Sequence, residues 1–189
     1  MRMARAVLLG IFAALLALPA AAQEPSRGGG FIHELKIGAQ VHDVPYLWSG
    51  FHVEKYAVDL NLEVIFSPSL AFLGGVLRPA LGATINFNGD TSKAYLDARW
   101  QRDFASGVFF ALGLGVAVHN GSALFDTYIP DPNAKELGRR VLFHPNVEIG
   151  YRLDEHRSVS VFFEHISNAS TARRNEGLDT LGIRLGHRF

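Results

Sequence analysis

Apolar residues occupy every second position along most of the chain. Between residues 56 and 66, one set of alternate positions is wholly apolar, whereas the other contains Asp59, Asn61 and Glu63. The same split recurs in residues 77–87, 108–118 and 141–152. A period of two residues is typical of a β-strand whose two faces meet different surroundings. The pattern therefore predicts an all-β protein.

Eight segments show this pattern, each about as long as the roughly 9–11 residues of a tilted membrane-spanning strand, or somewhat longer. They are residues 31–44, 55–67, 76–87, 92–103, 106–119, 138–153, 157–167 and 178–189. Eight antiparallel strands make the smallest usual outer-membrane barrel. We therefore predict an eight-stranded antiparallel transmembrane (outer-membrane) β-barrel.

Alternation alone also fits a soluble lipocalin-like barrel with its apolar face inward. Two features favour an apolar outer face. Small residues (Ala111, Gly113, Gly115 and Ala117) lie on the other face, where a narrow lumen would need them. Aromatic residues fall on the apolar face near strand ends, as in an interfacial girdle: Tyr56, Phe66, Trp100 and Tyr151. Charged residues of the lumen are expected to pair, because an unpaired buried charge is costly.

The connections between the strands alternate in length. Outward loops are expected at 45–54, 88–91, 120–137 and 168–177, and short inward turns near 103–105 and 154–156. Long outer loops and short inner turns are the outer-membrane pattern. The inward connection at 67–75 is longer than this pattern predicts. Three loop aromatics would either extend the interfacial belt or pack within the loops, namely Tyr46, Trp48 and Tyr128.

The two ends of the chain carry export signals. Residues 1–22 combine a basic start, an apolar run and an Ala-x-Ala site, which predicts a secretory signal peptide. Residues 23–189 then form a single domain. The chain ends on Phe189 after alternating apolar residues, which resembles the signal by which the barrel assembly machinery recognises its clients.

Composition narrows the function classes. The 18 basic and 18 acidic residues balance, which argues against nucleic acid as a partner. Cysteine is absent, so no thiolate metal site is expected.

In residues 159–170, VSVFFEHISNAS, a histidine and a serine occupy positions where the alternation would place apolar residues. By parity with Val161, His165 and Ser167 point outward, at the outer end of their strand. Asp179 shares the parity of the outward residues of the last strand and lies at the same rim. These three residue types form a catalytic triad in which a serine attacks, a histidine transfers the proton and an acid orients the histidine. Asn168 is then the candidate donor to an oxyanion.

The motifs H-I-S-N-A at 165–169 and N-E-G-L-D at 175–179 resemble the lipid A 3-O-deacylase (PagL) family of outer-membrane barrels. The resemblance implies His165 and Ser167 as catalytic residues, Asn168 at the oxyanion, and Asn175 and Gly177 in support. The acid falls on Asp179, where a glutamate is typical. Glu176, in the loop, is its rival.

The same resemblance implies hydrolysis of the ester-linked 3-hydroxyacyl chain at the 3-position of lipid A, without metal or cofactor. The substrate would be lipid A or lipopolysaccharide in the outer membrane of a Gram-negative bacterium, with the site facing the outer leaflet. Four loop arginines would meet lipid A phosphates or be solvated: Arg139, Arg140, Arg173 and Arg174.

Two other functions stay open on the residues alone. The chain can be a non-enzymatic adhesin or structural barrel in which H-x-S is incidental, or an outer-membrane phospholipase with the same nucleophile. The sequence also leaves open whether the barrel forms a homodimer.

Overall fold

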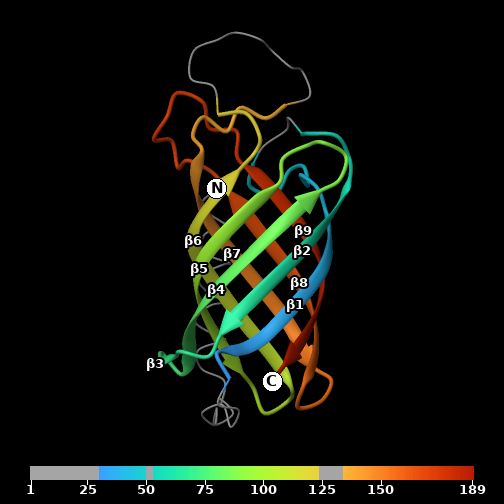
Figure 1. The fold of residues 1–189 in the computed structure, drawn as a ribbon, viewed down its shortest axis with the longest axis vertical. Coiled ribbons are helices and arrows are strands. Elements are labelled where there is room, and N and C mark those ends of the chain that lie inside the picture. The colour runs from blue at the N-terminus through green and yellow to red at the C-terminus, as the bar shows by residue number, and fades with distance from the viewer. Residues whose placement is uncertain (1–29, 50–52, 124–133) are drawn as a thin grey trace.

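The structure is a computed structural model that describes residues 30–49, 53–123 and 134–189. Its strands form one closed antiparallel barrel, because β2 pairs with β4 as well as with β1 (Figure 1). The strands are β1 (Ile32–Val41), β2 (Val58–Phe66), β3 (Leu70–Phe72), β4 (Gly75–Asn86), β5 (Lys93–Asp103), β6 (Val108–His119), β7 (Val141–Arg152), β8 (Arg157–Ile166) and β9 (Leu178–Arg188). Eight of them make the barrel wall, which confirms the predicted fold, and each begins and ends within three residues of its predicted bounds.

Two predictions about sequence segments lie outside the described residues: the signal peptide at 1–22 and the belt residue Tyr128. Within the described part of the chain, no helix has the length and apolarity needed to cross a membrane.

The additional strand β3, which is not part of the barrel wall, accounts for the long inward connection at residues 67–75. It folds back on the start of β4 as a small hairpin, whose turn holds Leu73 and Gly74 with φ of 48° and 69°. Left-handed residues at both central positions suit a tight hairpin turn. The extra residues of the connection therefore form structure of their own at the lower edge of the barrel (Figure 1).

The β3 hairpin also covers an aromatic residue that the pattern assigned to the lipid-facing girdle. The indole N–H of Trp100 donates a hydrogen bond of 2.7 Å to the Phe72 carbonyl, and Trp100 packs with Phe104 and Phe110. Only 8% of Trp100 is exposed. Trp100 points outward, as its parity predicts. The prediction that it faces lipid is wrong, because β3 lies over it.

The outer face of the barrel is apolar, as predicted. Its exposed residues include leucine, isoleucine and valine from seven of the strands in the wall: Leu62, Leu81, Leu96, Leu114, Ile149, Val161 and Ile183. The intervening positions are buried in the lumen, where Gly113 lies against the Asn146 side chain. Small residues thus make room for the polar side chains of neighbouring strands.

The charged residues of the lumen pair with one another, as expected. Glu148 accepts hydrogen bonds from Lys36 at 2.8 Å, from Arg184 at 2.6 Å and from Arg99. Arg184 also contacts Glu63 at 3.0 Å. Every one of these side chains is almost fully buried, so the pairing replaces the hydration that each charge has lost.

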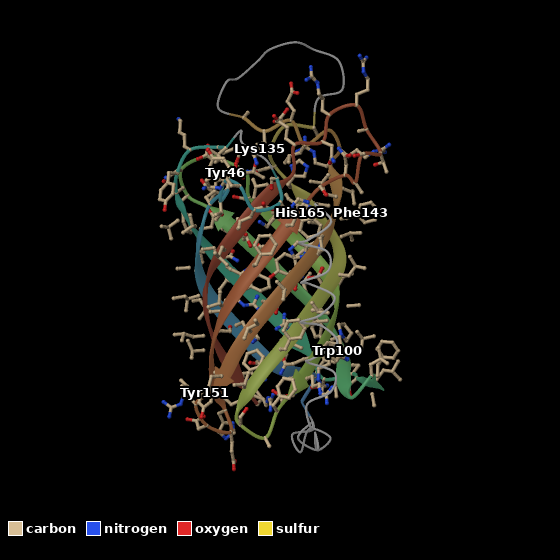
Figure 2. All side chains as sticks on the ribbon, turned by 180° about the vertical axis from the view of Figure 1, so that it is seen from behind. Tyr46, Trp100, Lys135, Phe143, Tyr151 and His165 are labelled. Atoms are coloured by element: carbon tan, nitrogen blue, oxygen red, sulfur yellow. The ribbon has the colours of Figure 1, made fainter. Side chains whose placement is uncertain are left out.

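The two ends of the barrel differ. The long connections from β1 to β2, β6 to β7 and β8 to β9 lie at one end, and the C-terminus lies at the other (Figure 1). Figure 2 shows Tyr46, Lys135, Phe143 and His165 toward the end with the long connections, and Trp100 and Tyr151 toward the opposite end. The predicted site residues therefore gather at the rim that carries the long loops.

The crowding of the lumen gives a test of the inward face. A Cβ at Gly115 would overlap the Leu96 carbonyl and the Asp97 carboxylate. Gly115→Val should therefore lower the free energy of unfolding by about 1–3 kcal/mol, the usual cost of overpacking, or prevent folding. The folded fraction is measured from the heat-dependent shift of the barrel in gel electrophoresis, and stability from guanidinium unfolding. Leu114→Val, at an outward neighbour that is 63% exposed, is the matched control and should stay near wild type. Equal stability of the two variants would contradict the inward assignment.

Candidate active site

His165 and Asp179 meet across two neighbouring strands. They are paired in the register of β8 and β9, and His165 Nδ1 lies 2.6 Å from Asp179 Oδ1. Both side chains are on the outer side of the wall, at the parity of Val161 and Ile183, yet His165 is only 4% exposed and Asp179 is fully buried. The structure thus brings two of the three predicted triad residues together, beneath a cover.

The cover is Trp48, in the connection between β1 and β2. Its indole stacks on the His165 imidazole, with ring centroids 4.5 Å apart and planes at 12°. The backbone N–H groups of Trp48 and Ser49 donate to Asp179 Oδ2 at 2.6 and 2.8 Å. The sequence predicts for Trp48 either the interfacial belt or loop packing, and it gives no sign of this contact, since no motif links Trp48 to the last strand.

Glu176 lies elsewhere in the site. Its carboxylate accepts the backbone N–H of Glu136 at 2.6 Å, and its own N–H donates to the Glu136 carbonyl at 3.3 Å. It therefore ties two outer loops together. Of the two candidate acids, Asp179 is the one in contact with the imidazole.

Ser167 lies on the same surface as His165, one step nearer the rim. Its backbone pairs with Phe143 of β7, with N–H to O distances of 2.9 and 3.2 Å. Ser167 is half-buried. Among the hydrogen bonds of the described residues, none joins Ser167 Oγ to the His165 ring. The structure therefore brings Ser167 to the site without a hydrogen bond between its hydroxyl and the His165 ring.

Asn168 differs from its predicted role as an oxyanion donor. Its side-chain N–H groups donate to the Leu137 carbonyl at 2.9 Å and to the Arg174 carbonyl, and its backbone N–H donates to Asn175 Oδ1 at 2.9 Å. An amide has only two side-chain N–H groups, so both are used in this arrangement. Asn168 and Asn175 thus brace the loop that follows the serine.

Other donors lie close to Ser167 in the same loop. Ala169 and Ser170 have φ of 51° and 63°, and both are exposed. Among the described residues, no acceptor is hydrogen-bonded to either backbone N–H. Two unused N–H groups two and three residues after a candidate nucleophile are available to a ligand.

Gly177 supports the histidine through close approach. Its φ of 63° favours glycine, and a Cβ there would lie 2.9 Å from His165 Cε1. Any larger residue would push the imidazole away from its present place. The imidazole is thus contacted by Asp179, Trp48 and Gly177.

The four predicted arginines lie in the outer loops, and all are exposed. Arg139 donates to the Thr171 carbonyl at 2.7 Å, Arg140 to the His119 carbonyl at 2.8 Å, and Arg174 pairs with Glu136 at 2.9 Å. Arg173 lies beside Arg174 in the same loop. Each has a guanidinium that presents five donors, of which these contacts use only some.

A model of the lipid A 3-O-deacylase (PagL) family matches residues 44–188. The match covers most of the chain and includes His165, Ser167 and Asp179. The chain belongs to this family. No curated protein sequence gives a match.

Three solved structures are similar to this chain to different degrees. The crystal structure of the outer membrane enzyme PagL matches with a TM-score of 0.59 and 18% identity, over 82% of this chain and 99% of that chain. The crystal structure of Neisserial surface protein A (NspA) matches with a TM-score of 0.49 and 12% identity, over 86% of this chain and 100% of that chain. The crystal structure of the outer membrane protein OprG from Pseudomonas aeruginosa matches with a TM-score of 0.39 and 12% identity, over 85% of this chain and 98% of that chain. The likeness to PagL at this identity shows a shared barrel fold.

A second buried polar group fills the outer mouth of this PagL-family barrel. We call it the mouth cluster, and it consists of His42, Asp43, Glu54, Asp59, Thr91 and Lys135. Glu54 accepts from His42 Nε2 at 2.9 Å and from Thr91 Oγ1 at 2.8 Å. Lys135 Nζ lies 2.7 Å from Asp43 Oδ1, and His42 Nδ1 lies 2.7 Å from Asp59 Oδ2. The cluster joins the connections from β1 to β2, β4 to β5 and β6 to β7.

In the mouth cluster, the surroundings of His42 and Glu54 favour the charged forms of these two side chains. Burial would lower the pKa of His42, but its hydrogen bonds to the Asp59 and Glu54 carboxylates raise the pKa to about 9. Burial would raise the pKa of Glu54, but the donors His42 and Thr91 lower it to about 2. No group of three or more metal-ligating side chains is found among residues 30–49, 53–123 and 134–189. The contacts of His42 with Glu54 and of Lys135 with Asp43 join the loops at the mouth.

The raised pKa of His42 predicts a loss of stability at alkaline pH. A histidine whose folded pKa lies above its ordinary value stabilises the fold fully below about pH 6.5, and this stabilisation is lost as the pH rises through about 9. Guanidinium unfolding midpoints between pH 6 and 10 should therefore fall for the wild type. His42→Gln should show a smaller change over the same range. Parallel profiles for the two proteins would contradict the assignment.

Proposed function

We propose that this chain is a lipid A 3-O-deacylase of the outer membrane. It hydrolyses the ester that links the 3-hydroxyacyl chain to the 3-position of lipid A. Membership of the PagL family supports the substrate class. The observation that carries the proposal is the His165–Asp179 hydrogen bond on the outer face of the wall, one step from Ser167.

The proposed reaction follows from the donors and acceptors of the pair. A His165 Nδ1–H donated to Asp179 leaves Nε2 as a proton acceptor. Nε2 takes the proton of Ser167 Oγ as the oxygen attacks the ester carbonyl, and gives it to the departing 3-oxygen of the sugar. Water, deprotonated by the same nitrogen, then attacks the acyl-enzyme carbonyl. The nitrogen returns that proton to Ser167 Oγ as the ester bond breaks and the fatty acid leaves. The reaction needs no metal or cofactor.

The tetrahedral intermediate requires donors to its negative oxygen. Because the side-chain amide of Asn168 is engaged with two carbonyls, we assign this role to the backbone N–H groups of Ala169 and Ser170. Asn168 and Asn175 hold their loop. Catalytic hydrogen bonds are often long before substrate binds, so a small rotation of Ser167 toward His165 on binding fits the reaction.

The surroundings suit a lipid substrate. Phe143, Val161 and Ile183 are about half exposed on the outer face near the site, where an acyl chain can lie. The four loop arginines stand at the same rim, where phosphates of lipid A would meet them. The substrate would enter by lateral diffusion in the outer leaflet.

The remaining inferences concern export. We infer that residues 1–22 are removed, that Phe189 is read by the barrel assembly machinery, and that the barrel lies in the outer membrane of a Gram-negative bacterium. A homodimer is compatible with this function and is not required by it.

The direct test is mass spectrometry of lipid A from cells that express the wild type or Ser167→Ala. The wild type should remove one 3-hydroxyacyl group, and the variant should leave lipid A intact, because the nucleophile is gone. Both barrels must be inserted, as judged by their heat-dependent gel shift. Lysophospholipid in place of shortened lipid A would indicate a phospholipase. Identical lipids in both strains would favour the adhesin or structural barrel.

The choice of acid gives a second test. Asp179→Asn removes the charge that stabilises the protonated imidazole and should lower kcat by about 10²–10⁴-fold, as in other triads. Glu176→Gln is the matched control, and it should change kcat by less than about threefold, because Glu176 holds a loop and not the imidazole. Rates are measured on purified lipid A in detergent. A larger loss in Glu176→Gln than in Asp179→Asn would reverse the assignment.

A further inference from the structure

We propose that Trp48 is a positioning residue for the His165–Asp179 pair, and that the mouth cluster holds it in place from inside the barrel. This inference rests on the deacylase function proposed above. It means that a residue of the connection between β1 and β2 positions a pair whose sequence motif lies in the last 25 residues of the chain.

Trp48 contacts both members of the pair at once. Its indole stacks on the imidazole at 4.5 Å, and its backbone N–H donates to Asp179 Oδ2. Trp48 is 63% exposed, whereas His165 beneath it is 4% exposed. The ring of His165 thus has the indole stacked on one face and Gly177 close to its Cε1 atom. Removing the indole would free the imidazole to turn away from Asp179.

The segment before Trp48 leaves the barrel mouth and crosses to the outer surface. Asp43 and Tyr46 have φ of 46° and 65°, so the chain turns sharply at both residues. The Val44 N–H then donates to the Asp179 carbonyl at 2.8 Å, which fastens the segment to the start of β9. The segment that carries Trp48 is thus held between the turn at Asp43 and the start of β9.

Asp43 is held by the mouth cluster. Its Oδ1 lies 2.7 Å from Lys135 Nζ, and its Oδ2 accepts the Glu54 N–H at 2.7 Å. The side chains of Asp43 and Lys135 are fully buried. Removing one partner of a buried ion pair leaves an uncompensated charge, so loss of Lys135 should displace Asp43. The path from Lys135 to His165 then runs through Asp43 and Trp48.

The first experiment separates positioning from substrate binding. Trp48→Ala should lower kcat by about 10- to 100-fold, the range for a slightly misplaced catalytic group, with KM within about threefold. Trp48→Phe keeps an aromatic ring and should retain kcat within about threefold of wild type. Tyr56→Ala is the matched control, because Tyr56 is a 79% exposed aromatic of the same connection, and it should leave kcat unchanged.

The second experiment tests the link to the mouth cluster. Lys135→Met should lower kcat in the same direction, and Lys135→Arg should recover most of it by restoring the charge. If Lys135 acts through Trp48, the double variant Trp48→Ala, Lys135→Met should be no slower than Trp48→Ala alone. All variants are compared as folded barrels on the same purified lipid A.

The outcomes distinguish the two proposals. A wild type without deacylase activity refutes the proposed function. An active wild type with unchanged kcat in Trp48→Ala, a change in KM alone, or an equal loss in Tyr56→Ala overturns the positioning role. Additive losses in the double variant overturn the link through Lys135 and leave Trp48 as an independent positioning residue.

Discussion

The two-residue period of the strands is the constraint on which both the barrel and its candidate site depend. Successive side chains of a strand lie on opposite faces, so Glu164 and His165 are separated by the barrel wall. Glu164 pairs with Lys93 at 2.8 Å in the lumen, and His165 pairs with Asp179 outside. A slip of one residue between β8 and β9 would turn Glu164 toward lipid and part His165 from its acid. The ion pairs of the lumen therefore favour the register that the site needs.

The outer loops are held by a different principle, because they have no ladder of backbone hydrogen bonds. The mouth cluster supplies opposite charges from separate connections, and each charge is stabilised only while its partner is in place. Lys135 and Asp43 are 92 residues apart in the chain, yet each is buried against the other. Such pairs add little stability compared with apolar packing, but they are selective for one arrangement of the loops. This selectivity is what a segment that carries Trp48 requires.

The sequence predicts the parts of this structure that repeat. The strand bounds follow from the alternation, and the meeting of His165 with Asp179 follows from parity at one rim. The alternation does not predict the short strand β3, since three residues show no period. Trp48, the mouth cluster and the engaged amide of Asn168 depend on contacts between irregular loops. Trp48 and Asp179 are 131 residues apart, and no local pattern encodes their distance.

A polar site on the lipid-facing side of a barrel must satisfy two demands at once. Its polar atoms need partners, because unpaired polar groups are costly where water is scarce. Its catalytic groups also need one fixed orientation. The contacts of Trp48 and Ser49 meet both demands, since their N–H groups occupy Asp179 Oδ2 and the indole covers the face of His165. In the proposed deacylase, the arrangement that would shield the pair from the membrane is therefore the same one that would align it for proton transfer.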